Sequence, residues 1–145
     1  MTVAFFGHRD RDYFEYHDKL LDIILDLVDN YDADKFLLGG YGRFDSFAAQ
    51  TVYEVKKIRP HIKTTKVLAY YPVKAENFYL WKGYDDSVYP PIGEGPPKFA
   101  ILRRNRWIVE NSDFIVSGIR QKYGGAYTAV CYAKKLKKPV LNLCE

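Results

Sequence analysis

The feature that most constrains the fold is a short apolar run, Phe36–Leu38, that passes through glycines into a helix. The run is too short for a helix and is typical of a buried strand. Gly39, Gly40 and Gly42 follow it, and the helix begins near Asp45. Glycines allow φ > 0 and a close approach of the backbone to a ligand, and a helix that starts here directs free N–H groups to the same place. The stretch predicts an anion site, with phosphate the usual ligand, or else a glycine turn that only caps the helix.

Short apolar runs alternate with amphipathic stretches along the whole chain. This alternation predicts right-handed βαβ units and a parallel sheet covered by helices on both faces, a three-layer α/β sandwich. We predict one domain over residues 1–145 with a five-stranded parallel sheet in the order 3-2-1-4-5. The expected strands are Val3–Phe6, Lys35–Leu38, Thr64–Tyr70, Asp113–Gly118 and Pro139–Leu143. The expected helices are Tyr13–Asn30, Asp45–Arg59, Pro97–Asn111 and a last one that follows Gly124-Gly125 and ends near Lys137.

The helical period predicts which side chains each helix buries. The first helix has an apolar stripe opposite a row of aspartates, which we interpret as a solvated face rather than a metal cluster. In the third helix Asn105 lies within the apolar stripe and Arg104 at its edge, so both are expected to face inward, whereas Arg103 and Arg106 are expected to be solvated. The stripes of the first two helices contain Leu20, Leu21, Ile24, Leu27, Val28 and Tyr31, and Ala48, Thr51, Val52, Val55 and Ile58.

Residues 71–97 interrupt the alternation of strands and helices. This aromatic and proline-rich segment is interpreted as an insertion in the domain, because loops of such length in a compact domain are usually functional or form lids. A surface flap or a dimer contact is the alternative. Its distinctive residues are Tyr71-Pro72, Trp81, Tyr84, Asp85-Asp86, Tyr89, Pro90-Pro91 and Pro96-Pro97.

Length and composition limit the class of protein. A chain of 145 residues is large enough for one domain with a real core. The sequence has no apolar run of membrane-spanning length and no leader-like start, so we expect a cytoplasmic protein without membrane association. Cys131 and Cys144 make neither a disulfide framework nor a metal motif, and no metal or cofactor is expected. A formal net charge of +4 is compatible with an anionic ligand and does not require nucleic acid.

Two further glycine-bearing loops resemble the one after Phe36–Leu38. Gly7-His8-Arg9 follows the first predicted strand, and Gly124-Gly125 follows the fourth. In the predicted strand order these three loops meet at the carboxyl edge of the sheet, where ligands bind to open α/β folds. Arg104 and Asn105 in the third helix are expected to face the same crevice. The sequence therefore predicts a concave, backbone-lined anion site.

The order of these motifs resembles the SLOG superfamily of Rossmann-like proteins over nearly the whole chain. Its members include the LOG-type nucleotide phosphoribohydrolases, the DNA-processing protein DprA and YpsA-like bacterial proteins. Phe6-Gly7-His8-Arg9 is similar to the YpsA-like opening, and Gly39-Gly40 with Gly42 and Asp45 is similar to the first double-glycine loop of the family. A block shared with LOG proteins comprises Arg104-Asn105-Arg106, Asn111-Ser112-Asp113 and Gly124-Gly125.

One position departs from the LOG pattern. LOG hydrolases carry a glutamate shortly after the second double glycine, where this chain has Val130 with Cys131 beside it. The carboxylate that would stabilise an oxocarbenium-like ribosyl centre is therefore absent from that place. The resemblance supports nucleotide-like ligand binding better than LOG chemistry, and we expect little or no hydrolysis.

The leading hypothesis is that a bacterial or phage SLOG-like protein binds or senses a nucleotide or a nucleotide-derived small molecule. The glycines would donate backbone N–H groups to phosphate, and the arginines would add charge-assisted hydrogen bonds. Asp45 would accept ribose hydroxyls or cap its helix, and Thr128 would add a hydroxyl donor. The predicted ligand-binding residues are Gly7, His8, Arg9, Gly39, Gly40, Gly42, Arg43, Asp45, Arg104, Asn105, Gly124, Gly125 and Thr128.

Two other functions remain open at this point. In a LOG-like N-glycosidic hydrolase or transferase, His8 and Asp45 would be the acid–base candidates, although a histidine in a glycine loop more often only forms hydrogen bonds. In a DprA-like DNA-binding or scaffold protein, bases of single-stranded nucleic acid would stack on aromatic residues among lysines, which scattered surface lysines also explain. We also expect a homo-oligomer. The residues behind the DNA-binding alternative are Lys63, Lys66, Tyr70, Tyr71, Lys74, Trp81 and Lys82.

Overall fold

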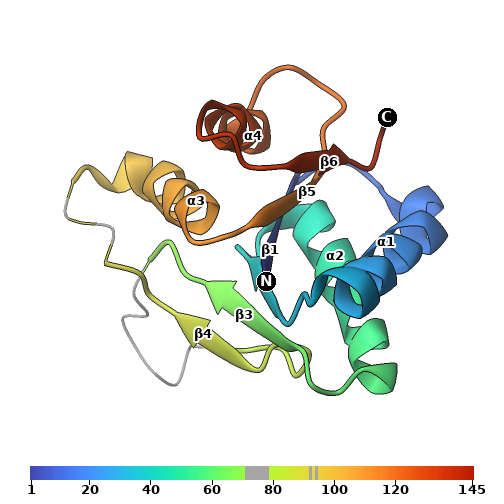
Figure 1. Cartoon of the computed structure of the whole chain (residues 1–145). Helices are drawn as coiled ribbons and strands as arrows, with labels where there is room; N and C mark the ends of the chain where they lie inside the picture. The colour runs from blue at the N-terminus through green and yellow to red at the C-terminus, as the bar shows by residue number, and fades with distance from the viewer. Residues whose placement is uncertain (71–78, 92, 94) are drawn as a thin grey trace.

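The sheet has six strands, all parallel, in the order β4-β3-β2-β1-β5-β6 (Figure 1). This computed structural model describes residues 1–70, 79–91, 93 and 95–145. β1 is central and apolar, with Val3 and Phe5 buried on one face and Ala4 and Phe6 on the other. The strands are β1 (Thr2–Gly7), β2 (Lys35–Leu38), β3 (Lys63–Val67), β4 (Asp86–Val88), β5 (Phe114–Gly118) and β6 (Val140–Asn142).

The parallel α/β prediction is confirmed, but the prediction of five strands is wrong. The sixth strand, β4, lies inside the segment interpreted as an insertion and pairs with β3 from Thr65↔Asp86 to Val67↔Val88. β4 is short and half polar, as edge strands commonly are, so it carries no apolar run for a sequence pattern to detect. The third strand also ends at Val67 rather than at Tyr70. Tyr71, Pro72 and Lys74 lie outside the described residues.

Two layers of helices cover the sheet (Figure 1). α1 (His17–Tyr31) and α2 (Gly42–Ile58) pack together on one face, and α3 (Ala100–Glu110) and α4 (Gly125–Lys135) pack together on the other. Short 3-10 turns precede α1 and α3, at Phe14–Tyr16 and Pro97–Phe99. The three-layer arrangement positions the start of α2, the start of α4 and the inner side of α3 around the end of β1.

Most residues of the predicted helical stripes are buried or half-buried, and the exceptions lie at two helix ends. Tyr31 is 59% exposed and Ile58 is 57% exposed. Each is the last residue of its helix, so no further turn covers it, although the helical period continues the stripe to that position. Inside α1 and α2 the buried residues are Leu20, Ile24, Leu27, Val28, Phe44, Asp45, Ala48, Ala49, Thr51, Val52 and Val55.

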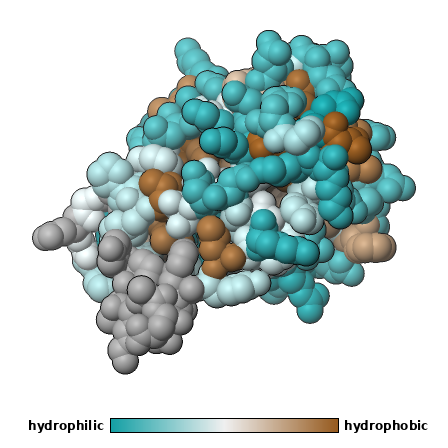
Figure 2. All heavy atoms as spheres, turned by 90° about the horizontal axis from the view of Figure 1, so that it is seen from below, coloured by the Kyte–Doolittle hydropathy of each residue, from teal (hydrophilic) through white to brown (hydrophobic). Residues whose placement is uncertain are grey.

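Opposite charges lie on opposite sides of the molecule. On one side of the sheet, α1 exposes an acidic row formed by Asp18, Asp22, Asp26 and Asp29. On the other side, α4 ends in exposed lysines, Lys134 and Lys135, and Lys137 follows them. The face shown in Figure 2 is mostly hydrophilic, and its hydrophobic residues form small separate groups. Within the described residues, no helix combines the length and the hydrophobicity needed to cross a membrane.

Candidate anion-binding site

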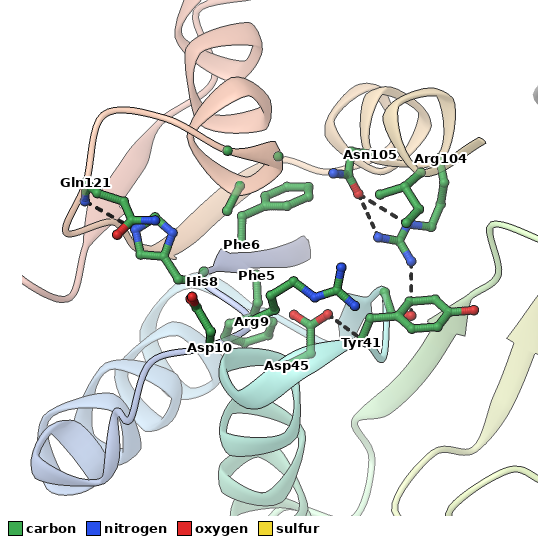
Figure 3. A pocket seen from close by; sticks show the side chains of 16 residues that line it. Phe5, Phe6, His8, Arg9, Asp10, Tyr41, Asp45, Arg104, Asn105 and Gln121 are labelled. Atoms are coloured by element: carbon green, nitrogen blue, oxygen red, sulfur yellow. Dashed lines mark hydrogen bonds between the residues drawn. The ribbon is translucent and has the colours of Figure 1, made fainter. Parts of the chain in front are cut away.

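A cavity of about 400 Å³ lies at the carboxyl edge of the sheet, where the chain passes from β1 to strands on either side (Figure 3). The loops after β1, β2 and β5 meet there with the inner side of α3, in the arrangement that the sequence predicts. The cavity is open to one side and has a mixed polar and apolar lining. The described residues that line it are Phe5, Phe6, Gly7, His8, Arg9, Asp10, Gly39, Tyr41, Asp45, Ile101, Arg104, Asn105, Gln121, Gly124, Gly125 and Ala126.

Arg104 brings a positive charge into the cavity. Its side chain is only 5% exposed, as the helical angle of α3 predicts, and burial lowers its pKa. Its guanidinium donates from Nη1 to the Gly39 carbonyl at 3.1 Å and from Nε and Nη2 to Asn105 Oδ1 at 3.2 and 2.9 Å. Since a guanidinium has five N–H donors, one N–H on each terminal nitrogen has no acceptor among the described residues. All three acceptor contacts are to neutral groups, so the charge has no carboxylate partner in hydrogen-bond contact.

Asn105 is the polar residue in the apolar stripe of α3, and Arg104 is its hydrogen-bond partner. It is 6% exposed, and its Oδ1 receives both bonds from the neighbouring arginine. Tyr41 completes the surroundings of that arginine, because the Arg104 Cζ lies 5.3 Å from the centre of the Tyr41 ring. Figure 3 shows Arg104 and Asn105 descending from α3 toward the turn that carries Tyr41. These contacts hold the guanidinium in one place.

Asp45 is a buried carboxyl group on the opposite side of the cavity. It is 8% exposed, and its Oδ2 accepts a hydrogen bond of 3.0 Å from the Tyr41 backbone N–H at the start of α2. Burial raises its pKa to about 6, and the Tyr41 N–H bond and the Arg104 charge act in the opposite direction. The carboxyl group thus caps α2 from inside the helix, although the helix begins at Gly42 and not at Asp45 as predicted.

The two helix starts at the cavity differ in what remains free to bind a ligand. At α2, the Tyr41 N–H is bonded to Asp45, and the Arg43 N–H is bonded to the Arg9 carbonyl at 3.0 Å. At α4, Gly124 precedes the helix with no side-chain cap, and none of the described residues accepts a hydrogen bond from the N–H groups of 125–127. The helix start that is open to an anion is therefore that of α4.

The glycines have different roles at the two turns. A Cβ on Gly39 would lie 2.6 Å from the Arg104 guanidinium, so this glycine makes room for a protein side chain. Gly124 has φ = 96° and open space where a Cβ would be, and a Cβ on Gly125 would meet only Asn105 Nδ2, at 3.9 Å. Only the second turn leaves its glycines facing unfilled space.

His8 fastens two of the loops together. Its Nε2 accepts hydrogen bonds from the backbone N–H groups of Arg120 at 3.0 Å and Gln121 at 3.3 Å. The backbone N–H of His8 donates to Tyr13 Oη at 3.0 Å, and the Tyr13 hydroxyl donates to the Gly118 carbonyl. Burial, followed by the charge of Arg11, lowers the pKa of His8. A neutral ring whose Nε2 accepts two backbone bonds is suited to holding the loop after β5 in place.

Four of the predicted ligand-binding residues are not among the residues that line the cavity. Gly40 faces a second, smaller cavity, and Gly42 and Arg43 border a shallow groove between α2 and the segment that leads from β1 to α1. The Thr128 hydroxyl donates back to the Gly124 carbonyl at 3.0 Å, inside the first turn of α4. A loop reverses direction within these few residues, so neighbours in sequence face different sides. The binding roles of the nine predicted residues that do line the cavity stay predictions.

Sequence reasoning did not select several lining residues. Tyr41 stands inside the glycine turn and was a visible candidate, because an aromatic residue between glycines is unusual in a turn that only caps a helix. Asp10 and Gln121 had no signal, since loop residues of these types are common on surfaces, whereas Ile101 lies on the same predicted stripe of the third helix as Asn105. Arg103 also differs from expectation: it is half-buried, and its Nη1 donates to the Pro96 carbonyl at 3.2 Å. Arg106 is exposed as expected, with its Cζ 5.5 Å from the Tyr132 ring centre.

Val130, at the place of the LOG glutamate, belongs to the core. It is 5% exposed and packs in a cluster with Phe6, Ile108 and Val109 between the sheet and the helices α3 and α4. Cys131 beside it is exposed. Neither residue is among those that line the cavity.

Comparison with known proteins gives a likeness in structure only. No protein-family model and no curated protein sequence matches the chain. The structure is similar to DprA from Helicobacter pylori, with a TM-score of 0.64 and 19% identity over 97% of this chain and 63% of that chain. DprA from Streptococcus pneumoniae gives a TM-score of 0.64 and 21% identity, over 96% of this chain and 48% of that chain. The molybdenum cofactor carrier protein from Chlamydomonas reinhardtii gives a TM-score of 0.58 and 18% identity, over 96% of this chain and 74% of that chain.

The fold resembles that of SLOG proteins. DprA and the molybdenum cofactor carrier protein are both Rossmann-like proteins of this kind, so the family resemblance suggested by the glycine motifs is confirmed at the level of the fold. The chain spans less than two thirds of the length of either DprA chain. The Helicobacter protein binds single-stranded DNA, and the Chlamydomonas protein is a carrier of the molybdenum cofactor.

Proposed function

We propose that this domain binds a nucleotide or a nucleotide-derived phosphorylated small molecule in the 400 Å³ cavity. Its phosphate group lies between the start of α4 and the guanidinium of Arg104. The cavity volume falls within the range of about 300–1,000 Å³ that is usual for small-molecule sites. Arg9, which Figure 3 shows extending across the cavity above Asp45, supplies a second positive charge at the rim.

The observation that carries this proposal is the buried charge of Arg104, which has no carboxylate in hydrogen-bond contact among the described residues. Burying an ion without a partner of opposite charge is unfavourable, and proteins usually pair or neutralise such groups. Here the charge is held by a carbonyl, an amide oxygen and an aromatic ring, and two N–H groups remain for a ligand. An anion that accepts from these N–H groups and from the open start of α4 would bring a negative charge into hydrogen-bond contact with the guanidinium.

We expect binding without rapid hydrolysis of the N-glycosidic bond. Val130 lies in the core, and His8 Nε2 already accepts two backbone hydrogen bonds. Asp45, with a pKa of about 6, remains the acid–base candidate of a hydrolase. Turnover of nucleoside monophosphates by the pure protein is the direct measurement, and robust release of the free base would move the catalytic role to Asp45.

Thermal unfolding in the presence of a nucleotide library tests the proposal. A ligand at a hundredfold excess over its Kd stabilises the folded state by about 2.7 kcal/mol, which is several degrees for a domain of this size. We expect phosphorylated nucleotides to raise the Tm and unphosphorylated nucleosides to raise it less. No shift with any nucleotide at millimolar concentration would contradict the proposal. Mass spectrometry of small molecules that stay bound through native purification would identify the natural ligand.

Binding of single-stranded DNA is a second candidate, favoured by a group of exposed tyrosines near the same edge of the sheet. Tyr41 is 40% exposed, Tyr70 48% and Tyr79 75%, and Lys66 lies with its Nζ 5.9 Å from the Tyr41 ring centre. Exposed aromatic rings among cations are suited to stacking on unpaired bases. The likeness of this chain to DprA is a likeness of fold. The test of DNA binding is the affinity for oligonucleotides measured as a function of salt concentration. A steep fall of log K with log salt would support this candidate, and a flat dependence would contradict it.

A further inference from the structure

A second cavity, of about 210 Å³, lies on the other side of the turn that contains Gly39, whose carbonyl accepts a hydrogen bond from Arg104. The turn residues alternate between the two cavities: Gly39 and Tyr41 line the first, and Gly40 lines the second. The described residues that line the second cavity are Gly40, Ser46, Ala49, Gln50, Lys66, Tyr79, Trp81 and Tyr84. They come from the turn, α2, β3 and the stretch that precedes β4.

One wall of this cavity is aromatic and well held. The rings of Trp81 and Tyr84 meet edge to face, with centroids 5.9 Å apart at 85°, and the Tyr84 N–H donates to the Trp81 carbonyl at 3.0 Å. A Cβ on Gly83 would come within 2.0 Å of the Trp81 ring, so this glycine permits the chain to fold the ring back. Asp85, next along the chain, accepts from the Thr64 N–H at 2.8 Å and fixes the stretch to β3.

A cation and two polar side chains complete the cavity. The Lys66 side chain runs along Gly40, with its Cε 2.5 Å from where a Cβ would be. No described carboxylate forms an ion pair with Lys66, and the Gln50 amide and Ser46 hydroxyl make no hydrogen bond to a described side chain or backbone group. The cavity therefore offers ring surfaces, one ammonium group, and an amide and a hydroxyl that can each donate and accept.

This combination matches the chemistry of a nucleobase. Aromatic walls favour a flat ring, and an amide such as Gln50 can pair with the donor and acceptor atoms on the ring edge. The ammonium of Lys66 favours a negative charge attached to that ring. Tyr41 links the two cavities, because its ring centre lies 5.3 Å from Arg104 Cζ and 5.9 Å from Lys66 Nζ.

We propose that the second cavity is a base-binding subsite, so that the ligand is a nucleoside phosphate lying across the turn of Gly39, Gly40 and Tyr41. This inference rests on the proposed function, because the phosphate of the same ligand binds beside Arg104. Lys66 faces the phosphate from the side of the second cavity. The stretch after residue 78, interpreted from sequence as an insertion, thereby supplies the wall that recognises the base.

The fluorescence of Trp81 tests the inference. The chain has two tryptophans, so Trp107→Phe, on α3 and outside both cavities, leaves Trp81 as the sole reporter. We expect adenosine 5′-monophosphate and adenosine to change the Trp81 emission and inorganic phosphate to leave it unchanged. Lys66→Met should weaken the monophosphate about tenfold and leave adenosine unaffected. Lys82→Met, which removes a cation 5.9 Å from the Tyr53 ring centre, is the matched control and should change the affinity for neither the monophosphate nor adenosine.

The outcomes separate this inference from the proposed function. If the monophosphate raises the Tm while the Trp81 emission stays constant, the base lies elsewhere and the inference is wrong, whereas phosphate binding in the first cavity stands. If adenosine changes the emission but phosphorylated nucleotides bind no better than adenosine, the base subsite stands and the phosphate site falls. Absence of both signals at millimolar ligand overturns both.

Discussion

At the scale of single residues, Arg104 links burial to binding. Replacing it with methionine removes the buried charge and keeps most of the side-chain volume. We expect Arg104→Met to weaken binding of a phosphorylated ligand tenfold to hundredfold, because a charge-assisted hydrogen bond contributes about 1.5–3 kcal/mol. Arg106→Met on the same helix removes an exposed arginine and is the control. Titration calorimetry of both variants with one nucleotide makes the measurement, and equal losses would show that the phosphate does not lie at Arg104.

The choice of control follows from the structure. The sequence pattern makes Arg103 the natural control as a solvated neighbour, but Arg103 is half-buried and holds the Pro96 carbonyl. Its replacement would disturb the segment that leads into α3. Arg106 has no such contact with the backbone, since its guanidinium lies over the Tyr132 ring.

Asp45 makes the stability of the fold depend on pH. Its pKa rises from 3.8 to about 6 on folding, so the folded protein binds the proton more tightly, and stability falls as pH rises between these values. The charged carboxylate then costs about 3 kcal/mol, at 1.36 kcal/mol for each pKa unit. Asp45→Asn keeps an acceptor for the Tyr41 N–H and removes the charge. We expect urea unfolding to show equal stability near pH 4 and an advantage for the variant near pH 7.5.

Each outcome at Asp45 has a clear meaning. A stability difference that stays constant from pH 4 to pH 7.5 would show that Asp45 titrates near its ordinary value. A phosphodiester ligand should be used if affinity is followed over the same range, since the second ionisation of a phosphomonoester falls near pH 6. The affinity of wild type for such a ligand should rise as the pH falls through 6, because the proton removes a negative charge from the cavity.

At the scale of elements, α4 has one side in the core and its first turn at the cavity. Val130→Glu places a carboxylate among apolar side chains, and we expect a loss of several kcal/mol in the free energy of unfolding. Cys131→Glu, one residue along and exposed, should change it by less than about 0.5 kcal/mol. Urea unfolding of the pair makes the measurement. Similar stabilities would mean that α4 is rotated about its axis relative to this structure.

The two glycine turns should respond differently to a methyl group. Gly125→Ala has space for its Cβ beside Asn105, so we expect unchanged stability and weaker binding of a phosphorylated ligand, because the methyl group enters the cavity. Gly39→Ala brings a Cβ against the Arg104 guanidinium and should lower the Tm. Thermal unfolding with and without nucleotide separates the two effects. Tight binding by Gly125→Ala would show that the phosphate lies away from α4.

The elements also show which features of the fold can be predicted from the sequence alone. Apolar runs located five strands and the four helices, because buried strands and amphipathic helices carry their period in the chain itself. β4 was missed, since three half-polar residues at a sheet edge have no period. The meeting of three glycine loops followed from topology, but the sides to which Gly40 and Gly42 turn depend on backbone angles within the turn. The bonding of His8 depends on the loop after β5, far away in sequence, and no local pattern encodes it.

At the scale of the whole molecule, α1 and the end of α4 carry opposite charge and lie on opposite faces of the sheet. The acidic row of α1 and the lysines at the end of α4 are complementary, so we expect copies of the chain to associate at low ionic strength. Salt at 1 M screens charges beyond about 3 Å and should separate them. Sedimentation velocity at low and high salt makes the measurement, with Lys134→Glu/Lys135→Glu as the variant that should stay monomeric. The same sedimentation coefficient under all conditions would contradict an electrostatic homo-oligomer.

The central position of β1 has a consequence for the synthesis of the protein. β1 leaves the ribosome well before β5, which is one of its two partners, with Val3 opposite Phe114. Until that partner emerges, the strand pairs only with β2 and keeps one row of backbone groups open, with apolar side chains on both faces. Such an edge is prone to pair with other chains. β1 is therefore protected on both sides only after β5 has been synthesised, and any product cut short before Phe114 carries β1 unpaired on one side.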